Sequence, residues 1–131
     1  MNGLVLNAMR TRVLVVDDNH DTADATATLL QLRGFDVDVA YNGRSAIEKA
    51  KRLSPDFLVL DLTLPDIDGY AVAARLRGEG LTNASLIAVS GQTPVDDEVW
   101  RDLDFTDYLV KPIDHEALIS LLSRAGVRKP A

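Results

Sequence analysis

The sequence has no cysteine, no long apolar run and no excess of positive charge. Without cysteine the chain has neither disulfide bonds nor thiolate metal sites, which fits a reducing compartment. No apolar run approaches the ~18 residues needed to span a bilayer, and the stretch LVL near the N-terminus is too short for the core of a signal peptide. The net charge of −6 disfavours nucleic acid and anionic membranes as direct partners. These absences lead us to expect a cytoplasmic protein.

The composition is that of an ordinary globular domain. The chain has 131 residues, of which 47% are hydrophobic and 26% charged, so disorder is excluded and a single domain is expected. There is no internal repeat and no low-complexity segment. We expect a flexible N-terminal tail over residues 1–11, one folded domain over residues 12–126 and a short tail over residues 127–131.

Short apolar runs alternate along the chain with segments of helical period. The apolar runs predict strands over residues 12–17, 35–41, 56–61, 84–90 and 106–110. The periodic segments predict helices over residues 20–33, 43–53, 70–77, 93–103 and 114–125. Strands that alternate with helices in this way form parallel sheets covered by helices on both faces. The fold class is therefore α/β, as a doubly wound sheet of five parallel strands.

The pattern of apolar and polar residues in the strands predicts their order in the sheet. Three strands contain the continuous apolar runs LVV, FLVL and LIAV, as strands covered on both faces do. The other two, DVDVAY and TDYLV, carry polar residues and suit the edges. With right-handed crossovers the order 2-1-3-4-5 satisfies this pattern, and it is the flavodoxin-like order.

Polar residues follow the strands at their carboxyl ends, where ligands bind in sheets of this kind. The first strand ends in Asp17-Asp18 and the third, its neighbour, in Asp61, while the other ends carry Ser90-Gly91 and Lys111-Pro112. Three converging carboxylates repel one another unless a cation lies among them, and Mg²⁺ is a hard ion that takes carboxylate and phosphate oxygens. Carboxylates, a divalent ion, a lysine and a hydroxyl are the groups that handle phosphoryl transfer.

Four motifs carry a resemblance to a known family. They are VVDDN at residues 15–19, DLTLPDIDG at 61–69, VSG at 89–91 and YLVKP at 108–112. Together and in this order, over residues 12–126, they resemble the receiver domain of two-component response regulators, the phospho-acceptor domain typified by chemotaxis receivers.

The resemblance implies a role for each acidic residue of the cluster. Asp61 matches the aspartate that accepts a phosphoryl group from a histidine kinase or a histidine phosphotransfer protein. Asp18 matches the direct ligand of Mg²⁺ (or Mn²⁺), and Asp17 the acid that holds the ion through water. Thr63 matches the position whose backbone carbonyl completes the protein ligands, so the implied metal ligands are Asp17, Asp18, Asp61 and Thr63.

The resemblance also implies how the phosphoryl group is held and sensed. Lys111 and Ser90 would each contact a phosphoryl oxygen, and Gly91 would leave access to the phosphorus. Tyr108 matches an aromatic switch residue, so the fourth helix, fifth strand and fifth helix would form the output face for a downstream protein, with a phosphorylation-linked dimer as one form of output. The peptide bond before Pro112 is expected to be cis.

Some residues near the motifs have plainer interpretations or depart from the family pattern. Asp66 and Asp68 are interpreted as turn residues, and His20 and His115 as solvated residues of first helical turns. Asp104 replaces the glycine that usually ends the fourth helix, and Trp100 stands in that helix where a small residue is common, either buried or as an anchor for a partner.

Several functions compete at this point. An FMN carrier shares the strand order, but the acidic loop after the first strand repels phosphate. A phosphatase or phosphotransferase would need a second acid at position 63. The remaining alternative is a degenerate receiver that acts as a phosphorylation-independent interaction module. The presence of Asp18, Asp61 and Lys111 argues against it. We therefore expect a self-phosphorylating phospho-acceptor switch that is not a turnover enzyme on free substrates, although autodephosphorylation is compatible with it. It would be either a stand-alone domain or one excised from a hybrid kinase or larger regulator.

Overall fold

The computed structural model describes residues 10–81, 83–91 and 102–125. Five parallel strands form one sheet in the order β2-β1-β3-β4-β5, which confirms the predicted order. The strands are β1 (Arg12–Val16), β2 (Asp36–Ala40), β3 (Phe57–Asp61), β4 (Ser85–Ser90) and β5 (Phe105–Val110). The described helices are α2 (His20–Leu32), α3 (Gly43–Leu53), α4 (Gly69–Gly78) and α6 (His115–Ala125).

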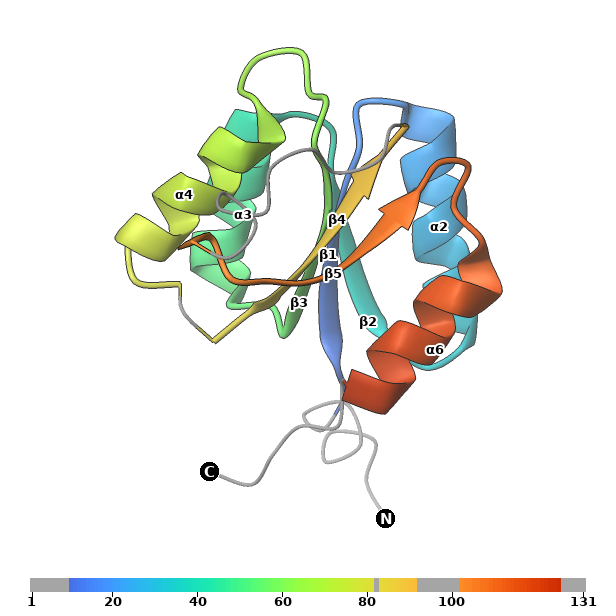
Figure 1. The fold of residues 1–131 in the computed structure, drawn as a ribbon. Helices are drawn as coiled ribbons and strands as arrows, with labels where there is room; N and C mark the ends of the chain where they lie inside the picture. The colour runs from blue at the N-terminus through green and yellow to red at the C-terminus, as the bar shows by residue number, and fades with distance from the viewer. Residues whose placement is uncertain (1–9, 82, 92–101, 126–131) are drawn as a thin grey trace.

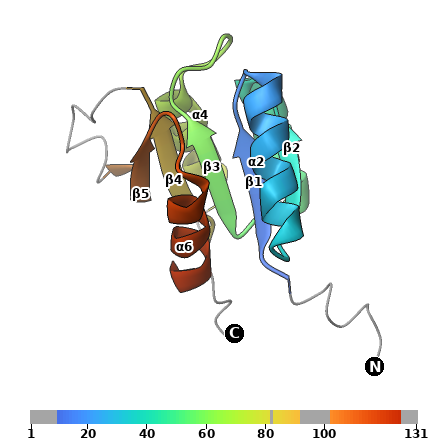
Figure 2. The same cartoon turned by 90° about the vertical axis from the view of Figure 1, so that its right-hand side faces the viewer.

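The helices form two layers, one on each face of the sheet (Figures 1 and 2). Helices α3 and α4 cover one face, where alternate residues of the central strands, such as Leu58 and Leu60, pack against Ile47 and Leu76. Helices α2 and α6 cover the other face, where the intervening strand residues pack against Leu30, Leu118 and Leu122 among others. Because β1, β3 and β4 lie between two layers, nearly all their residues are buried. This explains the continuous apolar runs in those strands.

Most element boundaries agree with the sequence prediction to within one or two residues. The first strand ends at Val16 rather than at Asp17, although the backbone N–H of Asp17 still donates to the carbonyl of Ala40. In α6 the buried residues are Leu118 and Leu122, whereas Ala117 and Leu121 are only partly buried. The helix expected over residues 93–103 lies almost entirely outside the described residues, and so does Trp100.

Side chains that accept hydrogen bonds from exposed backbone N–H groups fix the starts of the helices. Asn19 accepts from Thr22 at the start of α2, and Asn42 accepts from Ser45 at the start of α3. Asp68 accepts from the N–H of Tyr70 at the start of α4. Asp66 lies in the same turn as Asp68, but its carboxylate reaches across to the N–H groups of Gly43 and Arg44 in α3.

The turn before β5 contains Asp104, which stands where the family usually has glycine and adopts the left-handed conformation that glycine would adopt there. Asp104 has φ of 56°, which aspartate tolerates better than most residues. The guanidinium of Arg77 in α4 donates to the carbonyls of Leu103 and Asp104 in this turn, and to those of Leu81 and Ala84. Arg77 therefore ties the end of α4 to the start of β5. Across the described ranges there is no helix whose length and hydropathy would let it cross a membrane.

Candidate phosphoryl and metal site

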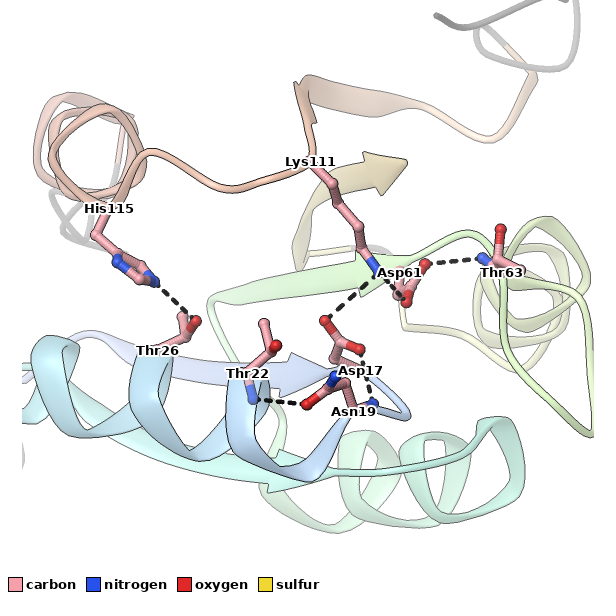
Figure 3. A network of polar contacts seen from close by, with 8 residues as sticks. All are labelled: Asp17, Asn19, Thr22, Thr26, Asp61, Thr63, Lys111 and His115. Atoms are coloured by element: carbon pink, nitrogen blue, oxygen red, sulfur yellow. Dashed lines mark hydrogen bonds and ion pairs between the residues drawn. The ribbon is translucent and has the colours of Figure 1, made fainter. Parts of the chain in front are cut away.

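The acidic residues that follow β1 and β3 lie together at the carboxyl edge of the sheet. Because β1 and β3 are hydrogen-bonded neighbours, Asp17 and Asp61 end up side by side (Figure 3). Their exposed fractions are only 3% and 1%, whereas Asp18 is exposed. One carboxylate oxygen from each of Asp17, Asp18 and Asp61 lies within 4.8 Å of the others. The structure therefore brings the three predicted acids into one cluster.

Lys111 supplies the positive charge of this cluster from the end of β5. Its Nζ lies 2.7 Å from Oδ2 of Asp61, to which it donates a hydrogen bond, and 3.7 Å from Oδ2 of Asp17 (Figure 3). The Lys111–Pro112 peptide bond is cis, the form that the resemblance implies. One lysine thus faces both buried carboxylates.

Backbone N–H groups hold the remaining oxygens of the two buried carboxylates. The N–H of Thr63 donates to Oδ1 of Asp61 at 2.9 Å, and the N–H of Asn19 donates to Oδ1 of Asp17 at 3.0 Å. Each carboxylate is therefore fixed by a donor two residues further along the chain (Figure 3). Such bonds set the plane of the carboxylate and limit its rotation, so the site is formed before any ligand arrives.

Burial and charge act against each other in this cluster. Burial raises the pKa of Asp17, and the N–H of Asn19 and the charge of Lys111 offset this effect only in part. Burial alone would lower the pKa of Lys111, but the hydrogen bond and charge of Asp61, with the charges of Asp17 and Asp18, outweigh it and raise that pKa. Lys111 therefore stays protonated, and the three carboxylates around it outnumber its single positive charge.

The donor set fits a hard divalent cation. Three carboxylate oxygens from two neighbouring strand ends converge at one place, and Lys111 neutralises only part of their charge. Oxygen ligands of this kind suit Mg²⁺, which is held by one or two carboxylates and keeps several waters. The group of Asp17, Asp18 and Asp61 could therefore hold such an ion.

The other residues of the predicted site lie on the strands beside the cluster. Ser90 is the last residue of β4, and its carbonyl accepts from the N–H of Lys111 at 2.8 Å. Gly91 is exposed, and a Cβ added to it would meet no described atom within 4 Å, so this position leaves open space above the strand end. Tyr108 in β5 is partly buried and packs against the core cluster covered by α3 and α4.

Gly69 is a residue of this region that sequence reasoning missed. A Cβ at this position would lie 2.5 Å from Cα of Leu62 and 2.6 Å from the carbonyl oxygen of Asp61. The start of α4 therefore packs directly on the backbone that carries Asp61, and its N–H donates to the carbonyl of Leu62. The glycine in DIDG marked a turn in the sequence, but only the fold reveals this close approach.

The two histidines were interpreted as solvated residues, but in the structure each makes a side-chain contact. Nε2 of His115 lies 3.0 Å from Oγ1 of Thr26, a buried hydroxyl in α2, so His115 joins α6 to α2 (Figure 3). His20 is exposed, but its ring stacks on that of Tyr41 with centroids 3.8 Å apart. Both contacts join segments that are distant in sequence, which is why local patterns did not show them.

Comparison with known proteins agrees with this geometry. A family model for the response regulator receiver domain matches residues 13–123. The transcriptional regulatory protein TrcR of Mycobacterium tuberculosis is 34% identical over 111 residues, which cover 85% of this chain and 43% of that protein. The transcriptional regulatory protein PrrA of Mycobacterium leprae is 37% identical over 120 residues, which cover 88% of this chain and 51% of that protein. The chain thus spans about half the length of these curated relatives.

A solved structure shows the same architecture. The CheY-like response regulator receiver domain from Methylobacillus flagellatus superposes with a TM-score of 0.80 at 30% identity, covering 88% of this chain and 98% of that one. The fold, the matched residues and the acidic site together define a signalling domain of the two-component class. The chain belongs to the response regulator receiver domain family. Receiver domains are phosphoryl-accepting switches and not turnover enzymes.

Proposed function

We propose that the chain takes a phosphoryl group onto Asp61 from the phosphohistidine of a histidine kinase or a histidine phosphotransfer protein, in a reaction that requires Mg²⁺ or Mn²⁺. The observation that carries this proposal is the environment of Asp61. Asp61 is 1% exposed as a residue, and its carboxylate contacts Lys111 at 2.7 Å and belongs to a cluster of three acids that fits a divalent cation. A carboxylate that merely ended a strand would need neither the lysine nor the two further acids.

The proposed step is a displacement at phosphorus. A carboxylate oxygen of Asp61 forms a bond to the phosphorus while the P–N bond to the donor imidazole breaks, and the electron pair of that bond returns to the imidazole nitrogen. The product is an acyl phosphate on Asp61, a case of covalent nucleophilic catalysis. Lys111 would move its contact to a phosphoryl oxygen, and the hydroxyl of Ser90 would donate to another.

The chain's own residues would also hold the ion. Asp17, Asp18, Asp61 and the backbone carbonyl of Thr63 are the proposed ligands, with Asp17 acting through water. When bound, the ion supplies positive charge that offsets the developing charge on the phosphoryl oxygens. The N–H of Thr63 keeps Asp61 oriented, which is a role separate from that of the ion.

A groove beside Lys111 suits the approach of the phosphoryl donor. It has a volume of about 610 Å³ and lies between the start of α2 and the segment that joins β5 to α6. Its lining includes Thr22 and Ala25 on one side and Pro112 and Ile113 on the other. A donor protein seated there would bring its phosphohistidine next to Lys111 and Asp61.

The output surface, the partners and the location remain part of the proposal. Tyr108 and the faces of β5 and α6, with the helix expected over residues 93–103, would change on phosphorylation and bind a downstream protein or a second copy of the chain. The transcriptional regulators to which the chain is similar are about twice its length, so DNA binding is not transferred to it. The cytoplasmic location stays a prediction.

Incubation with acetyl phosphate and Mg²⁺, followed by intact mass measurement, tests the proposal. We expect wild-type protein to gain one phosphoryl group and Asp61→Asn to gain none. Asp68→Asn is a matched control, because Asp68 caps α4 in the turn after Asp61 and asparagine caps a helix equally well. It should be labelled like the wild type.

Two further arms separate the metal from the acceptor. Removal of the ion with EDTA, or the substitution Asp18→Ala, should slow labelling strongly, and Mn²⁺ should restore it only in protein that keeps Asp18. If wild-type protein gains no phosphoryl group, or if Asp61→Asn gains as much as the wild type, the proposed function is wrong. A folded protein that resists labelling by every donor would instead be a degenerate receiver.

A further inference from the structure

Positive charge gathers on one surface of this acidic protein. Five of the fourteen Lys and Arg residues of the chain line a single open cleft over α3 and the adjoining side of α4, although the net charge of the chain is −6. These residues, which we call the basic cleft, are Arg44, Lys49, Lys51, Arg52 and Arg75. Among the described residues that line it, Glu48 is the one acid. The cleft is lined by residues of α3 and α4, and these helices cover the face of the sheet opposite the α2–α6 layer (Figures 1 and 2).

A carboxylate of the chain itself pairs with two of the basic residues that line this cleft. Glu79, just after α4, lies 2.7 Å from Nζ of Lys51 and 3.0 Å from Nε of Arg75, so its carboxylate bridges α3 and α4. The hydrogen bond from Lys51, together with that from Arg75, lowers the pKa of Glu79. Two of the five basic residues of the cleft are therefore already paired with an acidic side chain.

Of the other three basic residues, Lys49 is bound to Asp38 and to the carbonyl of Val39, whereas Arg44 and Arg52 have no such partner among the described residues. Arg44 and Arg52 are exposed, and neither guanidinium has a hydrogen bond or an ion pair with any residue that the structure describes. They stand eight residues apart on one helix, which places their Cα atoms about 12 Å apart along its axis. The start of the helix is fixed, because the carboxylate of Asp66 accepts from the N–H groups of Gly43 and Arg44.

We propose that the basic cleft is a docking surface for an acidic segment of a partner protein, with Arg44 and Arg52 binding carboxylates as Lys51 and Arg75 bind Glu79. The cleft measures about 950 Å³, which accommodates several side chains of a peptide rather than one small anion. In an extended segment, acids four residues apart span about 13 Å, which matches the spacing of the two arginines. This inference goes beyond the phosphoryl-accepting function and does not depend on it.

Charge favours an acidic peptide over a nucleic acid as the occupant. A nucleic acid presents phosphates well beyond the cleft, and these would meet the acids that give the chain its charge of −6. A short peptide needs only the local positive surface. Guanidinium groups also bind carboxylates in pairs of parallel hydrogen bonds, which gives such a contact direction as well as strength.

The experiment uses the full chain and a fluorescent 12-residue peptide with glutamates four residues apart. Fluorescence anisotropy at low and at physiological salt gives the Kd, and a peptide with glutamine in place of glutamate controls for charge. The test variant is Arg44→Gln with Arg52→Gln. Its matched control, Arg10→Gln with Arg33→Gln, removes the same charge from exposed positions outside the cleft.

We expect the double variant Arg44→Gln with Arg52→Gln to raise the Kd about tenfold at low salt. The control double variant should leave the Kd within about twofold of the wild-type value. Each single substitution in the cleft should give part of the increase. Equal losses in the two double variants, no saturable binding by the wild type, or tighter binding of a single-stranded oligonucleotide of equal charge would each overturn the proposal. Urea unfolding of all variants reports their folding, so this result can be read whether or not the chain is labelled by acetyl phosphate.

Discussion

The close approach at Gly69 makes a sharp prediction about a residue that touches no ligand. In Gly69→Ala the new Cβ would lie 2.5 Å from Cα of Leu62, whereas ordinary contacts of a Cβ begin at 3.4 Å. The start of α4 and the backbone after Asp61 would therefore have to separate by about 0.9 Å, and neither is a flexible side chain that can turn aside. Overpacking of this kind costs about 1–3 kcal/mol.

The same displacement should slow phosphorylation, because it moves the backbone that carries Asp61 and Thr63. A shift near 1 Å at reacting groups lowers rates by up to about a hundredfold. We expect the labelling rate with acetyl phosphate to fall about 10- to 100-fold, and urea unfolding to show the loss of stability. Both effects should appear in the presence of saturating Mg²⁺.

Gly78→Ala is the matched control in the same helix. A Cβ at Gly78, the last residue of α4, meets no described atom within 4 Å. Alanine there should stabilise the protein by up to about 1 kcal/mol and leave the labelling rate unchanged. If Gly69→Ala unfolds at the wild-type urea concentration and is labelled at the wild-type rate, the start of α4 does not position Asp61 and the reasoning is refuted.

Two further predictions concern single side chains. Burial raises the pKa of Asp17 in the folded protein. In the metal-free protein its contribution to the free energy of unfolding is therefore present at low pH and is lost as pH rises through that pKa. Asp17→Asn should therefore be more stable than wild type at pH 7, and the difference should shrink towards pH ~4. Urea unfolding at several pH values measures this difference. A variant that is less stable than wild type at pH 7 would contradict the prediction. Arg77→Met loses hydrogen bonds to the carbonyls of Leu81, Ala84, Leu103 and Asp104, and should cost about 2–3 kcal/mol. Arg77→Lys should recover less than half of this by urea unfolding, and an unchanged unfolding midpoint in Arg77→Met would show that these bonds do not hold the turn.

Sequence patterns predicted the sheet and the site because both depend on local signals. Runs such as FLVL report burial on two faces, so the strand order followed, and the end of each strand placed Asp17, Asp61 and Lys111 at one edge. The parallel order of β3, β4 and β5 predicted that Lys111 lies at the same edge as Asp61, and the structure adds the 2.7 Å contact between them.

Contacts between segments that are distant in sequence could not be predicted in this way. Asp66 was interpreted as a turn residue, but it also caps α3, because the turn after β3 lies beside that helix. His115 contacts Thr26 because α6 and α2 share one layer. The role of Gly69 depends on a backbone approach that residue identity alone does not report. In each case the partner is set by packing in three dimensions.

Chemical mapping of the phosphoryl group is the most direct test of the central claim. Borohydride reduces an aspartyl phosphate to homoserine, so protein labelled with acetyl phosphate and Mg²⁺ can be reduced, digested and sequenced by mass spectrometry. Our account predicts homoserine at position 61 and at no other aspartate. Homoserine at Asp17, Asp18 or another aspartate in place of position 61, or a labelled protein with no homoserine, would contradict it.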